Sequence, residues 1–360
     1  MDKLPYREFI AMMQERTREA DVPYSGSFEL TPLCNLDCKM CYVHLQDPSV
    51  RQRMLSGEQW LTLIQQAIEE GMMEALLTGG EAMTHPAFWD IYMYLINHGI
   101  VTRVKTNGLL LNEEAISRFK DYPPYKIDIS LYGCDSESYV AVTGVDAYEQ
   151  VVRHIRLAVE AELPIQLMVT PSSYMSPWTE RVMQLARSFY VSVMVNDYLI
   201  EPNDNTGRSK ADFDISLEEN IRIREKRKEL FSSGYSTGDH EFFMKRRNRP
   251  MLSDKGLYCD AGRSGFAVNW DGVMVPCLSF PRDVVCAYPL CDGFHEAWHE
   301  VNEAVKNYEI PQACHSCELN DKCHYCPMNH QKVAAKHQCD PDFCNHLKVR
   351  YKAFRKKEKK

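Results

Sequence analysis

The stretch that decides the fold is LTPLCNLDCKMCY, residues 30–42, which completes a short apolar segment and continues as a polar loop. Its three cysteines, Cys34, Cys38 and Cys41, have the spacing C-x3-C-x2-C. Three thiolates on one short loop can hold three irons of a cubane iron–sulfur cluster and leave the fourth iron without a protein ligand. A metal with an open coordination position is typical of a reactive site. The alternative is a structural zinc loop, which would need a fourth ligand.

Short apolar segments alternate with amphipathic ones between residues 27 and 200. The segments that we expect to be strands are Ser27–Leu30, Glu74–Leu77, Thr102–Lys105, Lys126–Leu131, Ile165–Val169 and Ser192–Leu199. The segments that we expect to be helices are Gly57–Glu70, one from near Pro86, one after Asn112, Tyr148–Ala161 and one after Ser176-Pro177. This alternation predicts right-handed βαβ units and a parallel sheet. Six units are too few for a closed eight-fold barrel, so we predict an α/β fold with a partial (βα)6 TIM-like barrel.

Capping signals support three of the expected helices. Ser56 and Gln59 stand at capping-box spacing before the first helix, and Ser216 and Glu219 do so before a charged helix further along the chain. Ser176-Pro177 has the pattern of an N-cap followed by a first-turn proline. The periodicity fades after Pro250, where short segments punctuated by Gly, Pro and Cys predict a module organised by metal.

Three further motifs stand directly after the expected strands. Thr78-Gly79-Gly80-Glu81 follows the second strand, Thr106-Asn107-Gly108 the third and Ser130-Leu131-Tyr132-Gly133 the fourth. Glycine lets a backbone approach a ligand closely, and a carboxylate suits a cation. In such sheets the chemistry lies at the carboxyl ends of the strands. The order of the motifs therefore predicts one site at that edge.

The cysteines are unevenly distributed. Of fourteen, three lie within Cys34–Cys41, ten lie within Cys259–Cys344, and Cys134 stands between them. The first residues, MDKLPYREFIAMMQER, show no secretory signal, so we expect a cytoplasmic protein in which clustered cysteines bind metal. Cys314-x2-Cys317-x5-Cys323-x2-Cys326 has too short a central spacer for a simple zinc ribbon.

Composition excludes several classes of protein. The 360 residues include 42 Lys and Arg against 50 Asp and Glu, a formal charge of −8, which disfavours a nucleic-acid binder. No run of about 18 apolar residues predicts a membrane span. Lys348–Lys360 is a basic tail, which we expect to be a solvated helix end, with contact to an acidic peptide or partner as the alternative.

The four strand-end motifs, in this order and with Tyr42 after the last cysteine, resemble the radical S-adenosylmethionine (radical SAM) superfamily over roughly residues 27–215. The resemblance implies that Cys34, Cys38 and Cys41 bind a 4Fe-4S cluster whose open iron chelates S-adenosylmethionine. An electron from the cluster then yields a 5′-deoxyadenosyl radical that abstracts hydrogen from the substrate. The cofactor-binding residues implied by the resemblance are Tyr42, Gly79, Gly80, Glu81, Thr106, Asn107 and Ser130. Glu81 belongs to the stretch that binds the methionine ammonium, although the usual following proline is replaced by Ala82.

The C-terminal cysteines resemble a SPASM domain, an extension of radical SAM enzymes with two auxiliary iron–sulfur clusters, which we expect to be 4Fe-4S. The resemblance implies one cluster held by Cys314, Cys317, Cys323 and Cys344, and another held by Cys259, Cys277 and Cys326. Two residues separate Cys323 from Cys326 where the commonest SPASM spacing has three. The cluster held by Cys259, Cys277 and Cys326 needs a fourth ligand, for which the sequence leaves four candidates: Cys286, Cys291, Cys339 or a thiolate of the substrate. A substrate thiolate in this position would favour thioether formation.

These expectations divide the chain into five parts. They are an N-terminal extension (1–25), a radical SAM barrel (26–232), a bridging segment (233–256), a SPASM domain (257–345) and the basic tail (346–360). For Cys134 the sequence allows two roles: a small buried residue of the fold, or a thiol that donates a hydrogen atom to a substrate radical.

Radical SAM enzymes with a SPASM domain most often modify ribosomal peptides, so the resemblance implies a peptide maturase that forms thioether or carbon–carbon links or oxidises a side chain. Leu278, after Cys277, replaces the aspartate that the sulfatase-maturating branch uses as a base. The first rival is a dehydrogenase or epimerase of a small molecule such as a sugar or alcohol, and the second is a non-catalytic metal-binding protein. The expected partners are a peptide substrate, a separate leader-recognition protein and an electron donor such as flavodoxin or ferredoxin.

Overall fold

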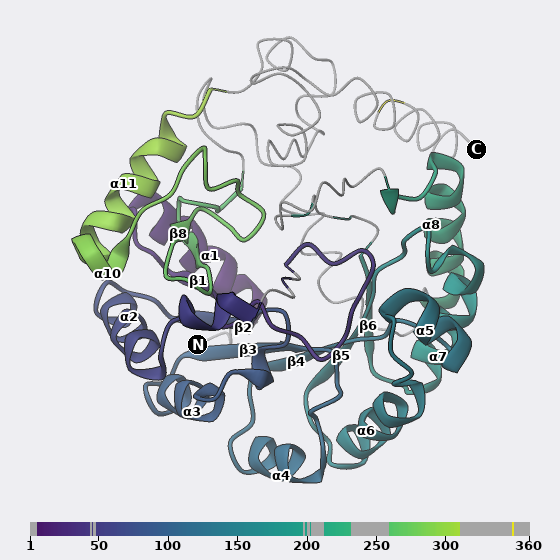
Figure 1. Ribbon diagram of the computed structural model, residues 1–360. Helices are drawn as coiled ribbons and strands as arrows, with labels where there is room; N and C mark the ends of the chain where they lie inside the picture. The colour runs from purple at the N-terminus through teal and green to yellow at the C-terminus, as the bar shows by residue number, and fades with distance from the viewer. Residues whose placement is uncertain are drawn as a thin grey trace, which may run out of the picture.

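A parallel sheet with helices on its outer side forms the body of the molecule (Figure 1). The computed structural model describes residues 6–43, 45, 48–196, 199, 202, 212–231, 259–309 and 348. Its strands are β1 (Ser25–Glu29), β2 (Glu74–Thr78), β3 (Val101–Thr106), β4 (Lys126–Ser130), β5 (Ile165–Val169), β6 (Ser192–Val195), β7 (Gly265–Val268) and β8 (Met274–Val275). They lie in the order β6-β5-β4-β3-β2-β1-β7-β8, and the pairs from β6 to β1 are all parallel. The predicted partial barrel is confirmed.

The helices follow the expected alternation. They are α1 (Tyr6–Glu19), α2 (Gly57–Glu69), α3 (Phe88–Asn97), α4 (Glu113–Asp121), α5 (Ser136–Thr143), α6 (Tyr148–Glu160), α7 (Thr179–Ser188), α8 (Leu217–Phe231), α10 (Pro289–Asp292) and α11 (Phe294–Lys306). Short 3-10 turns occur at Pro48–Gln52, Ala82–Thr84 and Ser176–Trp178. No described helix has both the length and the apolar composition needed to cross a membrane.

Local capping accounts for where two of the helices begin. The Ser56 hydroxyl accepts from the Gln59 backbone N–H at 3.3 Å, and the Gln59 side chain accepts from the Ser56 N–H at 2.9 Å. The predicted capping box of α2 is therefore confirmed. The Asn112 side chain likewise accepts from the Ala115 N–H at 3.0 Å at the start of α4. Such caps satisfy backbone donors that have no partner within the helix.

The fifth expected helix begins later than its sequence pattern predicts. Ser176–Trp178 forms a 3-10 turn, and α7 starts only at Thr179. The Ser176 hydroxyl does not cap this helix but bonds the Glu219 carboxylate at 3.1 Å. The prediction of an N-cap at Ser176 is wrong, because a partner from a distant helix takes its hydroxyl. The second helix also starts slightly late, at Phe88.

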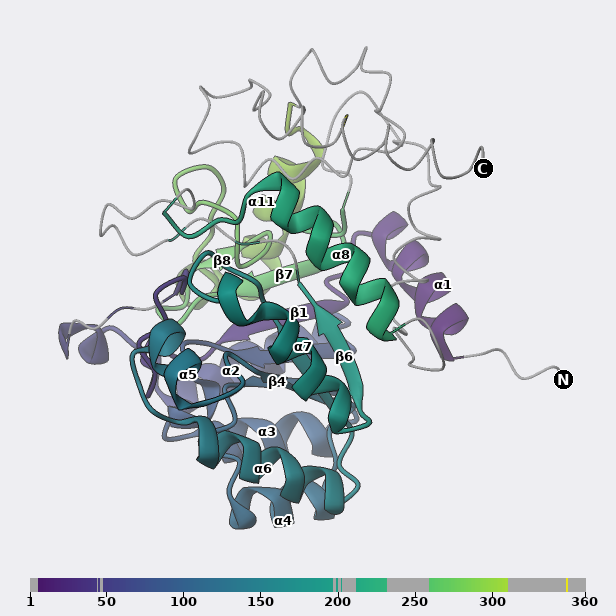
Figure 2. The same ribbon diagram turned by 90° about the vertical axis from the view of Figure 1, so that its right-hand side faces the viewer.

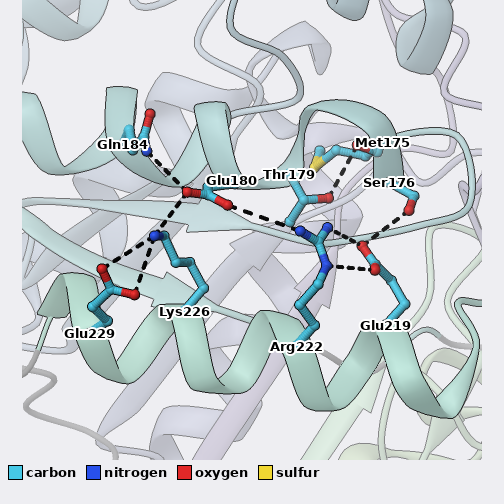
Figure 3. A network of polar contacts seen from close by, with 9 residues as sticks. All are labelled: Met175, Ser176, Thr179, Glu180, Gln184, Glu219, Arg222, Lys226 and Glu229. Atoms are coloured by element: carbon cyan, nitrogen blue, oxygen red, sulfur yellow. Dashed lines mark hydrogen bonds and ion pairs between the residues drawn. The ribbon is translucent and has the colours of Figure 1, made fainter.

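Charged side chains join α7 to α8, which run side by side in Figure 2. Figure 3 shows Glu180 of α7 between two cations of α8, with 2.9 Å to Lys226 and 4.0 Å to Arg222. Glu219 accepts from Arg222 at 2.8 Å, while the Ser216 hydroxyl accepts from the Glu219 backbone N–H at 3.2 Å. Exposed ion pairs of this kind contribute up to about 1 kcal/mol each. They specify how α8 lies on α7 more than they stabilise the fold.

The start of the C-terminal segment is built onto the barrel. Strand β7 pairs in parallel with β1, although we expected residues 257–345 to form a separate domain, and the division into domains stays a prediction. Phe266 of β7 packs between Phe28 of β1 and Phe294 of α11, with ring centroids 5.8 and 5.2 Å away. Trp298 of α11 donates from Nε1 to the Asp21 carbonyl at 2.6 Å. An apolar core, and not only metal, therefore organises this part of the segment.

Helix α11 is a regular amphipathic helix, in contrast to the fading periodicity expected after Pro250. Its buried face comprises Phe294, Ala297, Trp298, Val301, Asn302 and Val305. This spacing is the helical period, and Figure 1 shows the helix against α2. The expectation that short irregular segments alone follow Pro250 is therefore wrong.

Candidate active site

A cavity of about 230 Å³ lies at the carboxyl ends of the barrel strands, and the four sequence motifs meet there. The motif residues that line it are Cys34, Cys38, Cys41, Tyr42, Thr78, Gly79, Gly80, Thr106, Asn107, Ser130 and Tyr132. Two residues singled out in the sequence, Glu81 and Cys134, are not among its lining residues. Parallel strands bring residues far apart in the chain to one edge, which is why separate motifs form one surface.

The cysteine loop is fastened to the loop after β2 by backbone hydrogen bonds. The Gly80 N–H donates to the Thr31 carbonyl at 2.7 Å, and the Glu81 N–H donates to the Leu33 carbonyl at 2.9 Å. The two backbones are so close that a Cβ on Gly80 would lie 2.4 Å from the Leu33 oxygen. Glycine is required here because its lack of a side chain permits this approach.

The other side of the cysteine loop is held by α5, which we did not predict. The Asp37 N–H donates to the Thr143 carbonyl at 2.9 Å, and the Lys39 N–H donates to the Val142 carbonyl at 3.1 Å. These carbonyls belong to the last turn of α5, where a helix leaves acceptors without an internal partner. Asp135, in a capping box with Ser138, was the sequence signal for this short helix.

The three cysteines of the loop all line the cavity. No group of three or more His, Cys, Asp or Glu side chains in the described ranges converges on a single ion. Cysteine ligands of a cubane cluster each bind a different iron, so convergence on one point is not expected of them. Burial is the largest cause that raises the pKa of Cys34 to about 12, and burial likewise raises that of Cys38. Three thiols that face one cavity fit a soft metal cluster, which would bind them as thiolates.

Asn107 connects the loop after β3 to the cysteine loop. Its Nδ2 donates to Asn35 Oδ1 at 2.6 Å and lies 3.6 Å from Cys34 Sγ. Its Oδ1 accepts from the Leu109 N–H at 3.0 Å. Both ends of the amide are therefore used to shape the cavity wall around the first cysteine.

Glu81 is buried between the loops after β2 and β3. Its carboxylate accepts from the Asn107 N–H at 2.7 Å and from the Met83 N–H at 3.2 Å, and the side chain is 1% exposed. Burial raises the pKa of Glu81 to about 7, against the lowering effect of these bonds. Glu81 joins the loops after β2 and β3, so we expect it to act on a ligand mainly through the position of Asn107. Direct contact with the methionine ammonium stays a prediction.

A substitution series at Glu81 separates these roles. Glu81→Ala removes both carboxylate oxygens and is expected to weaken S-adenosylmethionine binding about ten- to a hundredfold. This factor corresponds to the loss of one charge-assisted hydrogen bond, which contributes roughly 1.5–3 kcal/mol. It should also lower the thermal midpoint, because the Asn107 N–H loses its acceptor. Glu81→Gln keeps an oxygen for that N–H and should retain the midpoint. Binding titration and thermal unfolding of both variants measure this; unchanged affinity in Glu81→Ala would contradict it.

Two tyrosines and Ser130 complete the wall opposite the glycines. Burial is the main cause that raises the pKa of Tyr132, and its neighbours Cys38 and Ser130 also affect that pKa. Burial also raises the pKa of Tyr42, and the charges of Glu29 and Cys277 contribute to that shift. The predicted auxiliary ligand Cys277 is therefore within electrostatic range of Tyr42, which lines the cavity.

The remaining cysteines are only partly placed. Cys134 lies in the loop between β4 and α5, where its Sγ is 3.8 Å from both Ser138 Oγ and Asp135 Oδ2. Its role as a hydrogen donor stays a prediction. Cys259 and Cys291 are exposed, and Cys277 and Cys286 are half-buried. The predicted ligands outside the described residues are Cys314, Cys317, Cys323, Cys326, Cys339 and Cys344.

Comparison with known proteins supplies a family and a fold. The model of the radical SAM superfamily matches residues 28–184. The sporulation killing factor maturation protein SkfB of Bacillus subtilis (strain 168) is 23% identical over 258 residues, 71% of this chain and 60% of SkfB. A probable GTP 3′,8-cyclase of Sulfurisphaera tokodaii is 33% identical over 140 residues, 38% of this chain and 44% of the cyclase. This chain thus spans 60% or less of these relatives.

The solved structures extend the likeness in fold to nearly the whole chain. SuiB of Streptococcus suis superposes with a TM-score of 0.69 at 14% identity, covering 94% of this chain and 83% of SuiB. At that identity the likeness concerns the fold alone.

Proposed function

The chain belongs to the radical SAM superfamily through residues 28–184, and from this premise we propose that it is an iron–sulfur enzyme that cleaves S-adenosylmethionine reductively and modifies a peptide. The single observation that carries the proposal is the meeting of Cys34, Cys38 and Cys41 with the glycine pair Gly79-Gly80 in one cavity. A 4Fe-4S cluster bound there would supply the electron that converts S-adenosylmethionine into a 5′-deoxyadenosyl radical. That radical would take a hydrogen atom from the substrate.

The residues of the chain have separate tasks in this proposal. Cys34, Cys38 and Cys41 hold the cluster on a loop that is fixed on both sides, by the backbone after β2 and by the end of α5. Gly79 and Gly80 leave backbone surface open to the methionyl part of S-adenosylmethionine. Thr106, Asn107 and Ser130 face its sugar and methionyl portions from the strand ends. Tyr42 closes the side toward Cys277 and restricts water.

The peptide substrate is supported by the longer of the two sequence likenesses. SkfB, described as a maturation protein, matches 71% of the chain, whereas the likeness to the probable GTP 3′,8-cyclase covers 38%. A small molecule as substrate is therefore the second candidate. A purely structural metal-binding protein is disfavoured, because such a site would not need a cavity beside its cysteines.

The cysteine-rich segment completes the proposal. We assign it two auxiliary clusters, one on Cys314, Cys317, Cys323 and Cys344 and one on Cys259, Cys277 and Cys326 with an open fourth ligand. A cytoplasmic flavodoxin or ferredoxin would supply the electron, and a separate recognition protein would present the peptide leader. The proximity of Cys277 to Tyr42 supports an auxiliary cluster near the cavity.

The test is anaerobic reconstitution of the full chain with iron and sulfide, followed by reduction in the presence of S-adenosylmethionine. The expected result is formation of 5′-deoxyadenosine. Iron analysis of the same sample is expected to exceed the four atoms of a single 4Fe-4S cluster. Iron binding without 5′-deoxyadenosine would contradict the proposed enzyme and favour the structural metal protein.

A further inference from the structure

One cation in the cavity has no task in the function proposed above. Lys105, on β3, contributes to the cavity wall together with Ser130 and Met168. Its neighbours in the strand, Val104 and Thr106, are buried, whereas the side chain of Lys105 is exposed. Within the described ranges no hydrogen bond or ion pair reaches the Lys105 ammonium group, which keeps a solvent-accessible surface toward the cavity.

The carboxylate that lies nearest to Lys105 in the sheet already forms an ion pair with another residue. Asp128 on β4 lies opposite Lys105 in the strand register. Both of its oxygens accept from Arg103 Nη2, at 3.2 and 2.9 Å, and the residue is 1% exposed. Lys126, one layer deeper, donates to the neutral Gln166 amide at 3.2 Å. Among the residues that the structure describes, three cations on β3 and β4 thus share one carboxylate, and the cation that faces the cavity has no counter-ion of its own.

An ammonium group in this position is an incomplete ion pair. The barrel wall around the exposed Lys105 side chain lowers its pKa by desolvation, the charge of Asp128 opposes this effect and the charge of Arg103 adds to it. Because the Lys105 side chain is exposed toward the cavity, an anion in the cavity can reach its charge directly. A single ammonium suits a monoanion, whereas phosphate groups are typically held by several donors or by a guanidinium fork. A carboxylate is therefore the expected ligand.

We propose that Lys105 binds a carboxylate of the substrate, which in a peptide is an Asp or Glu side chain or the C-terminus, and so positions the substrate in the barrel. This inference rests on the proposed function. Lys105 precedes Thr106 and Asn107 along the strand and so lies deeper in the barrel than the residues expected to hold S-adenosylmethionine. S-adenosylmethionine also has a carboxylate, but the depth of Lys105 favours the second ligand of the cavity.

The test is a selection from displayed short peptides of random sequence on the anaerobic, reconstituted full chain with S-adenosylmethionine present. Peptides selected by the wild type are expected to be enriched in Asp and Glu. Lys105→Met should lose that enrichment and bind the wild-type peptides about ten- to a hundredfold more weakly. Lys105→Glu should reverse the preference toward Lys and Arg. The matched control is Lys120→Met, on the exposed surface of α4, which should keep the acidic preference.

Titration of S-adenosylmethionine into the same variants distinguishes the two sources of carboxylate. Unchanged affinity in Lys105→Met, together with the lost peptide preference, supports the proposal. A tenfold weaker affinity for S-adenosylmethionine with an unaltered peptide preference would overturn it and assign Lys105 to that cofactor. A wild type that forms 5′-deoxyadenosine yet selects no acidic peptides would overturn only the role of Lys105. A wild type that forms no 5′-deoxyadenosine would overturn the proposed function itself.

Discussion

Replacing Cys34, Cys38 and Cys41 together by alanine is expected to abolish 5′-deoxyadenosine formation and to leave a folded protein. The chemistry depends on the thiolates, because no other described group in the cavity offers three soft ligands to iron. The fold depends on other groups. The loop that bears these cysteines is held by backbone hydrogen bonds to the strand end after β2 and to α5, which the substitution leaves in place.

Two measurements check this expectation. Iron per chain should fall by the content of one cluster while the rest is retained, and the circular dichroism spectrum should match that of the wild type. Retained 5′-deoxyadenosine formation would remove the cysteine loop from the reaction. An unfolded triple variant would instead show that the metal holds this loop together, contrary to the contacts described above.

Gly80→Ala is expected to displace the cysteine loop without changing any proposed ligand. The added Cβ would lie 2.4 Å from the Leu33 oxygen and 2.6 Å from the Pro32 oxygen, closer than real Cβ contacts allow. Both are backbone atoms, so the loop itself must move. Forcing atoms into a well-packed position typically costs about 1–3 kcal/mol. We expect the N-terminal cluster to be lost in most chains and 5′-deoxyadenosine formation to fall with it.

Gly99→Ala is the matched control for this substitution. Gly99 also lies in a turn between two elements and has φ of +72°, but a Cβ there would meet no atom within 4 Å. It should cost only the backbone strain of a left-handed residue, about 1 kcal/mol, and leave the iron content intact. Equal iron content in the two variants would show that the tight approach at Gly80 does not matter for the cluster.

The barrel was predictable because its signals are local. The strand Ile165–Val169 is a short, mostly apolar run, Lys126–Ser130 alternates polar and apolar residues, and the helix at Gly57–Glu69 has its apolar stripe within the segment and its cap directly before it. The motifs after the strands could be placed at one edge because parallel strands carry their carboxyl ends to the same side. Propensity, capping and alternation need no knowledge of distant residues.

Helix starts and side-chain roles were less predictable, since they depend on partners elsewhere in the chain. Ser176 has the pattern of an N-cap, yet Glu219 on α8 takes its hydroxyl. Glu81 carries the expected charge next to two glycines, yet the Asn107 N–H from the next loop takes its carboxylate. In both cases the competing hydrogen-bond partner lies more than twenty residues away, where no local pattern reveals it.

By itself the sequence determined the fold class and the strand ends that carry the motifs, because each rests on spacing within a short segment, and it predicted the three cysteines of the candidate site in the same way. Only the tertiary structure decided that β7 joins the barrel beside β1 and that α11 packs on it. Tertiary structure alone also decided that, within the described ranges, Asp128 pairs with Arg103 and not with Lys105. Pairing between distant strands and competition for one carboxylate are settled by packing, and packing depends on the whole chain at once.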